Sequence, residues 1–483
     1  MCAVCGRGVS RKLRWCLLGL IAMAVLVRCF SGSASYAQEP GERYDTLPAK
    51  LDAREARQLA PALEQALRNT SGFGAEQKAV DDYLTKYYLP NLTVYSPEAL
   101  ADLAKDREKY FKNYIAKASH ASSRQHLVEI AFKFGQYCVR KNMHPAVRYN
   151  AVLMLGDLDQ QPATGTTPPI PLPAATSELL DLVEQDEFNG VPVPESLKLG
   201  ALIGLERHSR YGIDPQVKDR LTKAMLAMVA DRESPEDVDQ NVHDWVITLA
   251  AQVLANQNAK EPSQEVQDAL TKLIADEKLG LDDRCKVAAL LKKMTYAPGG
   301  AVSGAATVPA LGQLTLDVVS EGAKLAKKYQ KEFLGEGGIT APMAGGYGGR
   351  GGYGGGYGGE GGYGGGYGGE GGYGGGYGGG FSGTQEDTGP KFERRLLMAR
   401  LVDIARGGNS LSEGLPDAEK EQIGSLIDEM KPVINVIEDK DAVQIDVSSA
   451  VIELEERLKT LLATWQLPED KPAEEAGEDD FAG

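Results

Sequence analysis

The chain has 483 residues, of which 42% are hydrophobic and 25% are charged, so it is long enough for two or three folded units of ordinary soluble composition. Its formal net charge is −16, which disfavours general binding to nucleic acid because the phosphate backbone is also negative. We therefore expect no nucleic-acid partner.

Residues 1–37 have the pattern of a signal peptide. The leader begins with four basic residues, Arg7, Arg11, Lys12 and Arg14, and an apolar run follows over 15–27. Ser35 and Ala37 are small residues at the positions that a signal peptidase reads, which predicts cleavage after Ala37. The apolar run is shorter than the roughly 20 residues that a membrane-spanning helix needs. We expect an exported protein of the periplasm or cell envelope; an uncleaved leader acting as an anchor is the alternative, and the sole membrane contact expected.

Loss of the leader changes the charge and the cysteine content. Removal of residues 1–37 takes away five basic residues and no acid, leaving 47 basic against 68 acidic residues and a net charge of −21. Four cysteines leave with it, and Cys138 and Cys285 remain. We expect two separate buried thiols, although a disulfide between them in an oxidising compartment stays open.

Residues 45–297 are predicted to form one helical domain. Apolar residues recur at helical spacing, alternation typical of strands is scarce, and Pro and Gly mark short connections. One longer, proline-rich break at 161–176 is interpreted as a semi-rigid surface loop. The pattern is that of many helices joined by short loops.

Internal similarity is the strongest signal in this domain. The segments 147–156 (VRYNAVLMLG), 197–206 (LKLGALIGLE) and 246–255 (VITLAAQVLA) align without gaps at offsets of 50 and 49 residues. Each has a central alanine (Ala151, Ala201 and Ala250), and Arg284, Val287 and Leu291 suggest a fainter fourth copy. A small central residue allows a neighbouring helix to approach closely, so each segment is interpreted as the inner helix of a two-helix unit.

These segments resemble the HEAT-type α-solenoid family. The best copy is MHPAVRYNAVLMLGDLD at 143–159, and the resemblance extends over about 140–260. It implies a right-handed stack of helix pairs with an extended concave surface, and it implies no reaction. The spacing near 50 residues is long, and Lys198 and Ile247 stand where the first copy has Arg148. An irregular helical array without HEAT geometry therefore stays open.

Residues 298–340 are predicted to be a connector that contains an amphipathic helix at 314–334. Val319, Ala323 and Ala326 lie along one stripe of this helix. Four lysines cover the other side: Lys324, Lys327, Lys328 and Lys331. We interpret the lysines as the solvated face of a helix that caps the array; docking to a membrane surface or to a partner is the alternative.

Residues 341–390 are rich in glycine and tyrosine and are predicted to be a disordered linker, because such a segment cannot build an apolar core and glycine loses most entropy on ordering. For 36 residues, coil behaviour predicts a span of roughly 30–36 Å. The tyrosines are Tyr347, Tyr353, Tyr357, Tyr363, Tyr367, Tyr373 and Tyr377. Weak self-association through these rings is the alternative to a plain linker.

Residues 391–467 are predicted to form a small helical hairpin or bundle, followed by an acidic disordered tail at 468–483. A first apolar stripe is expected to end at Gly407-Gly408 and a second to end before Pro432. The last helix carries an apolar seam spaced 3, 4, 3 and 4 residues apart: Val451, Leu454, Leu458, Leu461 and Trp465. The pairs Glu453–Arg457 and Glu455–Lys459 are expected on its solvated side.

Known catalytic and ligand-binding motifs are not found. The histidines His120, His126, His144, His208 and His243 form no paired metal-ligand spacing, and neither a nucleophile elbow nor a phosphate-binding loop occurs. The run 237–241 opens like a calcium loop, but Val242 stands where glycine is required, so it is interpreted as an acidic turn before a helix. We therefore predict no catalytic residue, no metal ligand and no cofactor.

The sequence as a whole predicts an exported, non-catalytic scaffold or binding protein that presents an α-solenoid surface to another macromolecule of the cell envelope, with a protein as the partner. One alternative is an envelope enzyme whose catalytic carboxylates are dispersed along the sequence. Another is a structural protein that self-associates through the glycine–tyrosine tract. Whether the chain is an enzyme stays open, with the absence of motifs favouring a binding role.

Overall fold

The computed structural model describes residues 44–236, 238–297, 303–334, 391–439 and 441–465, and these are mostly α-helical, as predicted. The expected leader, the glycine–tyrosine tract and the acidic tail lie outside the described residues. The described helices are α2 (Ala53–Arg68), α3 (Gln77–Tyr83), α4 (Leu89–Asn91), α5 (Pro97–Lys109), α6 (Ala121–Val139), α7 (Pro145–Gly156), α8 (Pro173–Glu184), α9 (Glu195–Tyr211), α10 (Pro215–Ala230), α11 (Gln240–Gln257), α12 (Gln264–Ala275), α13 (Leu281–Leu290), α14 (Thr307–Leu334), α15 (Lys391–Ser412), α16 (Asp417–Glu438) and α17 (Gln444–Ala463).

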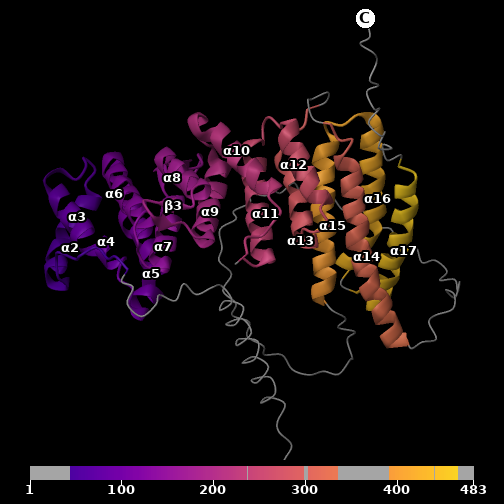
Figure 1. The fold of residues 1–483 in the computed structure, drawn as a ribbon, viewed down its shortest axis with the longest axis horizontal. Helices are drawn as coiled ribbons and strands as arrows, with labels where there is room; N and C mark the ends of the chain where they lie inside the picture. Colours follow the sequence, from indigo (N-terminus) through magenta and orange to yellow (C-terminus); the bar gives the residue numbers. More distant parts are fainter. Residues whose placement is uncertain (1–43, 237, 298–302, 335–390, 440, 466–483) are drawn as a thin grey trace, which may run out of the picture.

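The helices lie in two rows along an elongated molecule (Figure 1). Helices α7, α9, α11 and α13 each pack against the next in that order, and α8, α10, α12 and α14 form the second row. The helices also pack in pairs across the rows, α6 on α7, α8 on α9, α10 on α11 and α12 on α13. The three similar segments of the sequence thus fall on α7, α9 and α11, and the faint fourth copy falls on α13.

Small residues set the spacing within the first row. The predicted central alanines Ala151, Ala201 and Ala250 are all buried. The tightest contact lies elsewhere, where Gly156 of α7 meets Gly204 of α9: a Cβ atom added to Gly156 would lie 2.8 Å from the Cα atom of Gly204. Only glycine at both positions allows these two backbones to approach so closely.

Two buried arginines each donate to a backbone carbonyl at the C-terminal end of a neighbouring helix. The Arg148 guanidinium donates to the Val139 carbonyl at the end of α6, with Nη2 at 2.9 Å, and Arg284 Nε donates to the Ile274 carbonyl near the end of α12 at 2.8 Å. Carbonyls in the last turn of a helix have no partner within the helix, so each arginine satisfies one of them. Lys198, at the matching position in α9, instead pairs with Asp186 and Glu195.

Two short hairpins interrupt the helices. Strands β1 (Asp159–Gln161) and β2 (Ile170–Pro171) form the first hairpin, and β2 lies within the surface loop expected at 161–176. Helix α8 already begins at Pro173, so the last four residues of that expected loop are helical. Strands β3 (Glu187–Phe188) and β4 (Val191–Pro192) are joined by Asn189 and Gly190, which both have positive φ (52° and 78°). An Asn-Gly pair in this conformation is the preferred two-residue hairpin turn.

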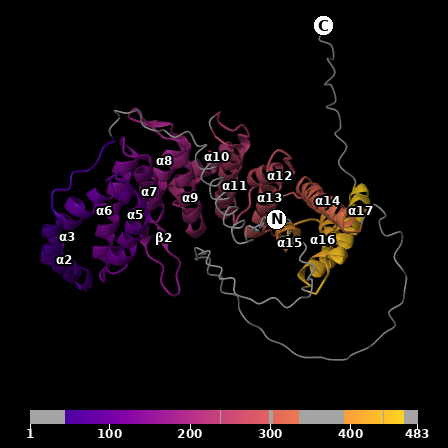
Figure 2. The same ribbon diagram turned by 90° about the horizontal axis from the view of Figure 1, so that it is seen from below.

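The C-terminal helices are packed onto the end of the two rows rather than standing apart from them. Helix α15 packs against α13, and α14 packs along α17, so α14 to α17 form a bundle that shares one continuous apolar core with the rest (Figures 1 and 2). The amphipathic helix expected at 314–334 is the C-terminal part of α14, and its stripe residues Val319, Ala323 and Ala326 are buried. The connector and the C-terminal unit distinguished in the sequence thus meet in this bundle.

Three expectations for this region were wrong. Helix α15 does not end at Gly407-Gly408 but continues to Ser412. Gly407 instead allows α15 to approach α13 closely, since a Cβ atom there would overlap the Ala288 carbonyl oxygen. Helix α16 likewise continues through Pro432 to Glu438. Glu455 pairs with Lys459 as expected, yet it is buried and also accepts from Lys327 Nζ at 2.7 Å, so it joins α17 to α14.

Candidate functional site

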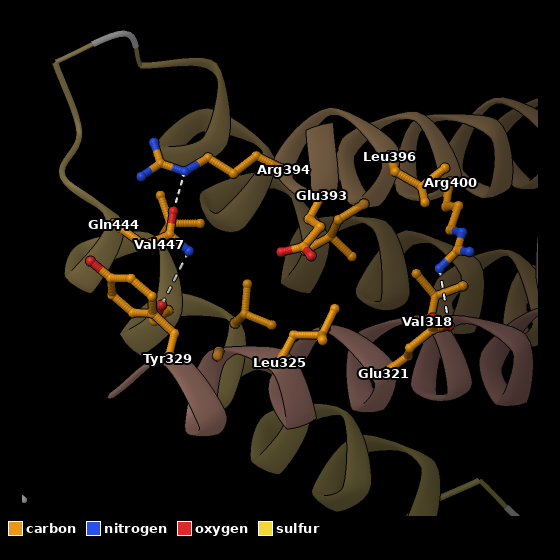
Figure 3. Close-up of a pocket in the computed structure, with 15 residues that line it drawn as sticks. Val318, Glu321, Leu325, Tyr329, Glu393, Arg394, Leu396, Arg400, Gln444 and Val447 are labelled. Carbon is orange, nitrogen blue, oxygen red and sulfur yellow. Dashed lines mark hydrogen bonds and ion pairs between the residues drawn. The ribbon is translucent and has the colours of Figure 1, made fainter. Parts of the chain in front are cut away.

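An apolar groove between α14, α15 and α17 is the clearest candidate site (Figure 3). Its volume is about 80 Å³. The residues that line it are Val318, Glu321, Gly322, Leu325, Ala326 and Tyr329 of α14, Glu393, Arg394, Leu396, Leu397 and Arg400 of α15, and Gln444, Val447, Ser448 and Val451 of α17. We call this set the bundle groove.

Helix α14 shapes the floor of the bundle groove. A Cβ atom at Gly322 would lie 3.3 Å from both Leu397 and Val451, so glycine there lets three helices converge. One turn further along, Leu325 is 43% exposed, and its side chain points into the groove beneath α15 (Figure 3). A large apolar side chain left this open at the meeting of three helices is a surface that a further apolar group would cover.

Polar residues surround the apolar floor. Arg400 contacts Asp282 at 2.6 Å and Glu321 at 3.1 Å, which fixes it across α13, α14 and α15. Arg394 donates to the Ala442 carbonyl at 3.1 Å and also to Gln444. The carboxylate of Glu393 points toward α14 in the middle of the groove (Figure 3). The groove thus offers apolar surface with a carboxylate acceptor above it.

The size of the bundle groove limits its ligand. Small-molecule and cofactor sites typically enclose about 300–1,000 Å³, and this groove is several times smaller. It has room for one inserted side chain rather than for a cofactor. The groove therefore fits contact with a polypeptide.

A polar cluster at the ends of α5, α7 and α9 is the nearest approach to paired catalytic carboxylates. Burial raises the pKa of Asp157 and of Asp159 above the usual range for aspartate, which is a property of general acids. Each carboxylate, however, is beside an arginine: Arg207 Nη2 lies 2.9 and 2.8 Å from the two oxygens of Asp159, and Arg107 Nε lies 3.8 Å from Asp157. Neither aspartate lines the bundle groove or the pockets beside Arg68 and beside His126. The arginines of this cluster thus join α5, α7 and α9 to the two carboxylates.

All five histidines have structural contacts in the described chain. The Nδ1 atoms of His120 and His144 accept from backbone N–H groups at the starts of α6 and α7, and His126 lies 2.5 Å from Asp81. His243 Nε2 lies 3.2 Å from the Asp231 carbonyl. His208 is fully buried between the Thr176 hydroxyl at 2.9 Å and the Gly156 carbonyl at 3.0 Å.

The environment of His208 determines its charge and tautomer. Burial lowers its pKa to about 3, so the imidazole is neutral at neutral pH. A neutral ring has one donor and one acceptor. Since a carbonyl only accepts, Nε2 donates to Gly156 and Nδ1 accepts from Thr176. The ring therefore links α7, α8 and α9 and is not placed for proton transfer with solvent.

The two cysteines and the acidic turn before α11 also have structural roles. Cys138 and Cys285 are buried, free thiols, as expected, and burial raises the pKa of both. Asp239 accepts from the Asn241 N–H at 2.8 Å at the start of α11, which is the acidic turn expected there; Asp237 lies outside the described residues. No group of three or more His, Cys, Asp or Glu that could hold a metal occurs within the described ranges.

Comparison of the chain with protein-family models, with curated proteins and with solved structures finds no match. Among the helices of the described part, none is long and apolar enough to cross a membrane.

Proposed function

We propose that this protein is an exported, non-catalytic scaffold or binding protein that presents a HEAT-like solenoid surface to a protein partner of the cell envelope. The observation that supports it best is the arrangement of α7, α9, α11 and α13, each packed against the next one in the row. Such a row grows in length rather than in thickness, so it offers a long surface to a large partner.

Charge and exposed aromatic groups narrow the class of partner. The leaderless chain has a net charge of −21, which favours a neutral or basic protein and disfavours nucleic acid. Trp245 on α11 and Tyr211 at the end of α9 are 44% and 41% exposed. Half-exposed tryptophan and tyrosine are side chains typical of protein-binding hot spots.

The enzyme alternative receives less support from the site geometry. An enzyme with dispersed catalytic carboxylates needs those carboxylates to converge on an open cleft. Asp157 and Asp159, whose pKa values are raised, lie beside arginines, and the bundle groove holds the Glu393 carboxylate above an apolar floor. The self-association alternative concerns residues 341–390, which lie outside the described residues.

Site-specific photo-crosslinking in the native envelope tests the proposal. Benzoylphenylalanine replaces Trp245 or Tyr211 in separate variants, and Tyr137 of α6, which is 43% exposed, serves as a matched aromatic control in the N-terminal part. We expect the first two positions to give the same crosslinked protein and the third to give none. Identical crosslinking from all three positions, or none from any, would contradict a partner surface along α9 and α11.

The proposed export has its own test. The first residue of the protein isolated from the envelope fraction should be Gln38, because cleavage is predicted after Ala37. Edman sequencing or mass spectrometry of the intact protein measures this directly. A chain that begins at Met1 in that fraction would show that the leader is retained, which is the anchor alternative.

A further inference from the structure

The bundle groove lies between the two points where residues 335–390 leave and re-enter the described chain. Helix α14 ends at Leu334, five residues after Tyr329, and α15 begins at Lys391, two residues before Glu393. Both Tyr329 and Glu393 line the groove. At 1.5 Å per residue, Leu334 is about 8 Å along the helix axis from Tyr329. The segment that contains the glycine–tyrosine tract is therefore attached at both of its ends beside this groove.

We propose that tyrosine rings of the tract at residues 345–380 insert into the bundle groove of the same chain. The proposal concerns contacts within the chain and does not depend on the proposed function. Three observations carry it: the position of both attachment points, the single-side-chain size of the groove, and the match between a phenol ring and the groove lining.

The length of the connection allows the insertion. Tyr347 follows Leu334 by 13 residues, and Tyr377 precedes Lys391 by 14 residues. A glycine-rich coil of 13 residues spans roughly 20 Å, which exceeds the separation of the attachment points from the groove. A ring on so short a tether has an effective concentration of about 1 mM. Seven tyrosines share this advantage, so occupancy does not require high affinity from any one of them.

The groove lining suits a tyrosine better than other residues of the tract. Leu325, Leu397 and Val451 provide apolar contact for the ring. The Glu393 carboxylate, which points over this floor (Figure 3), can accept a hydrogen bond from a phenol hydroxyl. Arg394 and Arg400 lie at the rim, where a guanidinium can contact an aromatic face. Glycine, the other abundant residue of the tract, has no side chain to fill the groove.

A second copy of the chain or a separate protein could also supply an aromatic side chain. The tract of the same chain is favoured because its effective concentration of about 1 mM exceeds the concentration of any free partner in a dilute sample. An insertion within one chain is independent of protein concentration, whereas an insertion between copies is not. This difference decides the design of the test.

Amide hydrogen exchange on the whole protein tests the proposal. Seven rings at about 1 mM each, with a Kd of about 1 mM for the groove, slow the local opening of α14 and α15 at residues 318–329 and 393–400 by about eightfold. A variant with all seven tyrosines changed to serine should lose this protection, and a variant with all seven changed to phenylalanine should keep most of it. Tyr→Phe is the matched control because it preserves ring, length and glycine spacing.

A change on the groove side completes the experiment. Leu325→Ser should speed amide exchange in the groove as much as the seven Tyr→Ser changes do. A variant that combines both changes should exchange little faster than either one alone. Trp245→Ser, a similarly exposed position on α11, should leave exchange in the groove unchanged. Equal exchange in the parent and in the seven-serine variant would overturn the proposal.

A crosslink identifies the occupant. Benzoylphenylalanine in place of Leu325 should form an intramolecular crosslink to a peptide from 345–380, with a yield that stays constant when the protein is diluted tenfold. A crosslink that disappears on dilution would assign the groove to a second copy. A crosslink only to another protein would assign it to a partner. Either outcome would refute insertion within the chain.

Discussion

At the scale of single residues, two buried basic side chains have different structural roles. His208 and Arg148 are both buried in the first row, yet the imidazole is neutral and links three helices, whereas the guanidinium satisfies a helix-terminal carbonyl. The low pKa of His208 follows from burial and from the nearby Arg207, and it links stability to pH.

His208 predicts a specific loss of stability in acid. Its pKa is about 3 in the folded protein against an ordinary 6.5, so the unfolded state binds more protons below pH 6.5. The contribution of His208 to the free energy of unfolding is complete above pH 6.5. It decreases by about 1.4 kcal/mol per pH unit as the pH falls from 6.5 toward 3. Urea unfolding of the parent and of His208→Gln at pH 7, 6, 5 and 4 measures it.

The difference between these two proteins isolates the histidine from the other titrating groups. We expect His208→Gln to be less stable at pH 7, because it loses the exact fit between Thr176 and Gly156, and we expect the gap to narrow steadily toward pH 4. A gap that stays constant over this range would show that the pKa of His208 in the folded protein is close to its ordinary value of 6.5.

At the scale of helices, glycine controls how closely neighbours pack. Gly156→Ala places a methyl group against the Gly204 backbone of α9 and should lower the free energy of unfolding by about 1–3 kcal/mol, the usual cost of overpacking. Gly424→Ala in α16 is the matched control, since nothing lies within 4 Å of the added Cβ atom. That variant should be stabilised by about 0.5–1 kcal/mol. Thermal unfolding followed by circular dichroism compares the two; equal midpoints would contradict the contact.

The contact between α13 and α15 depends on glycine at position 407. In Gly407→Ala the new methyl group meets the Ala288 carbonyl oxygen, whereas the neighbouring Gly408→Ala meets Ile423 at an ordinary 3.4 Å. Cys285 of α13 is buried, and burial raises its pKa to about 12 although the nearby Arg400 of α15 acts to lower it. We expect Gly407→Ala to make Cys285 react with a thiol reagent at neutral pH, and Gly408→Ala to leave it protected.

Cys138 of α6 is the internal control for this labelling, since it is buried far along the row from α15. It should stay unreactive in both variants while the protein remains folded. Reaction of both cysteines together would indicate global unfolding. Protection of Cys285 in Gly407→Ala would show that α15 tolerates the methyl group without moving.

The helices and their approximate ends could largely be predicted from the sequence, because Pro97, Pro145 and Pro215 stand at the first helical positions and the apolar spacing is regular. The same residue types misled at Gly407 and Pro432, where a close helix contact and a tolerated internal proline outweigh their usual role as helix ends. The Asn189-Gly190 pair is a recognisable signal of a hairpin turn, but hydrophobic periodicity alone does not reveal it. The bundle groove could not be predicted, since it combines residues more than 100 positions apart, such as Leu325 and Val447.

At the scale of the whole molecule, the C-terminal bundle completes the end of the two rows. A fragment spanning residues 38–300 contains α2 to α13 but lacks α15, which covers α13. We expect this fragment to keep its helical circular dichroism and to melt cooperatively, at a lower temperature than the whole protein. It should also expose Cys285, but not Cys138, to thiol reagents. A fragment without helical signal would refute the independent folding of residues 45–297.

The rows and the bundle differ in how far apart in the sequence their contacting residues lie. In the rows, most partners are neighbours in sequence, which allows contacts to form early and locally. Glu455 and Lys327, by contrast, are separated by 128 positions, and α14 and α15 are joined through 56 residues. Closing a connection of that length costs about 3.6 kcal/mol in chain entropy. During synthesis, the apolar faces of α13 and α14 therefore stay uncovered until the last helices are made, and in this interval the chain is exposed to aggregation and proteolysis.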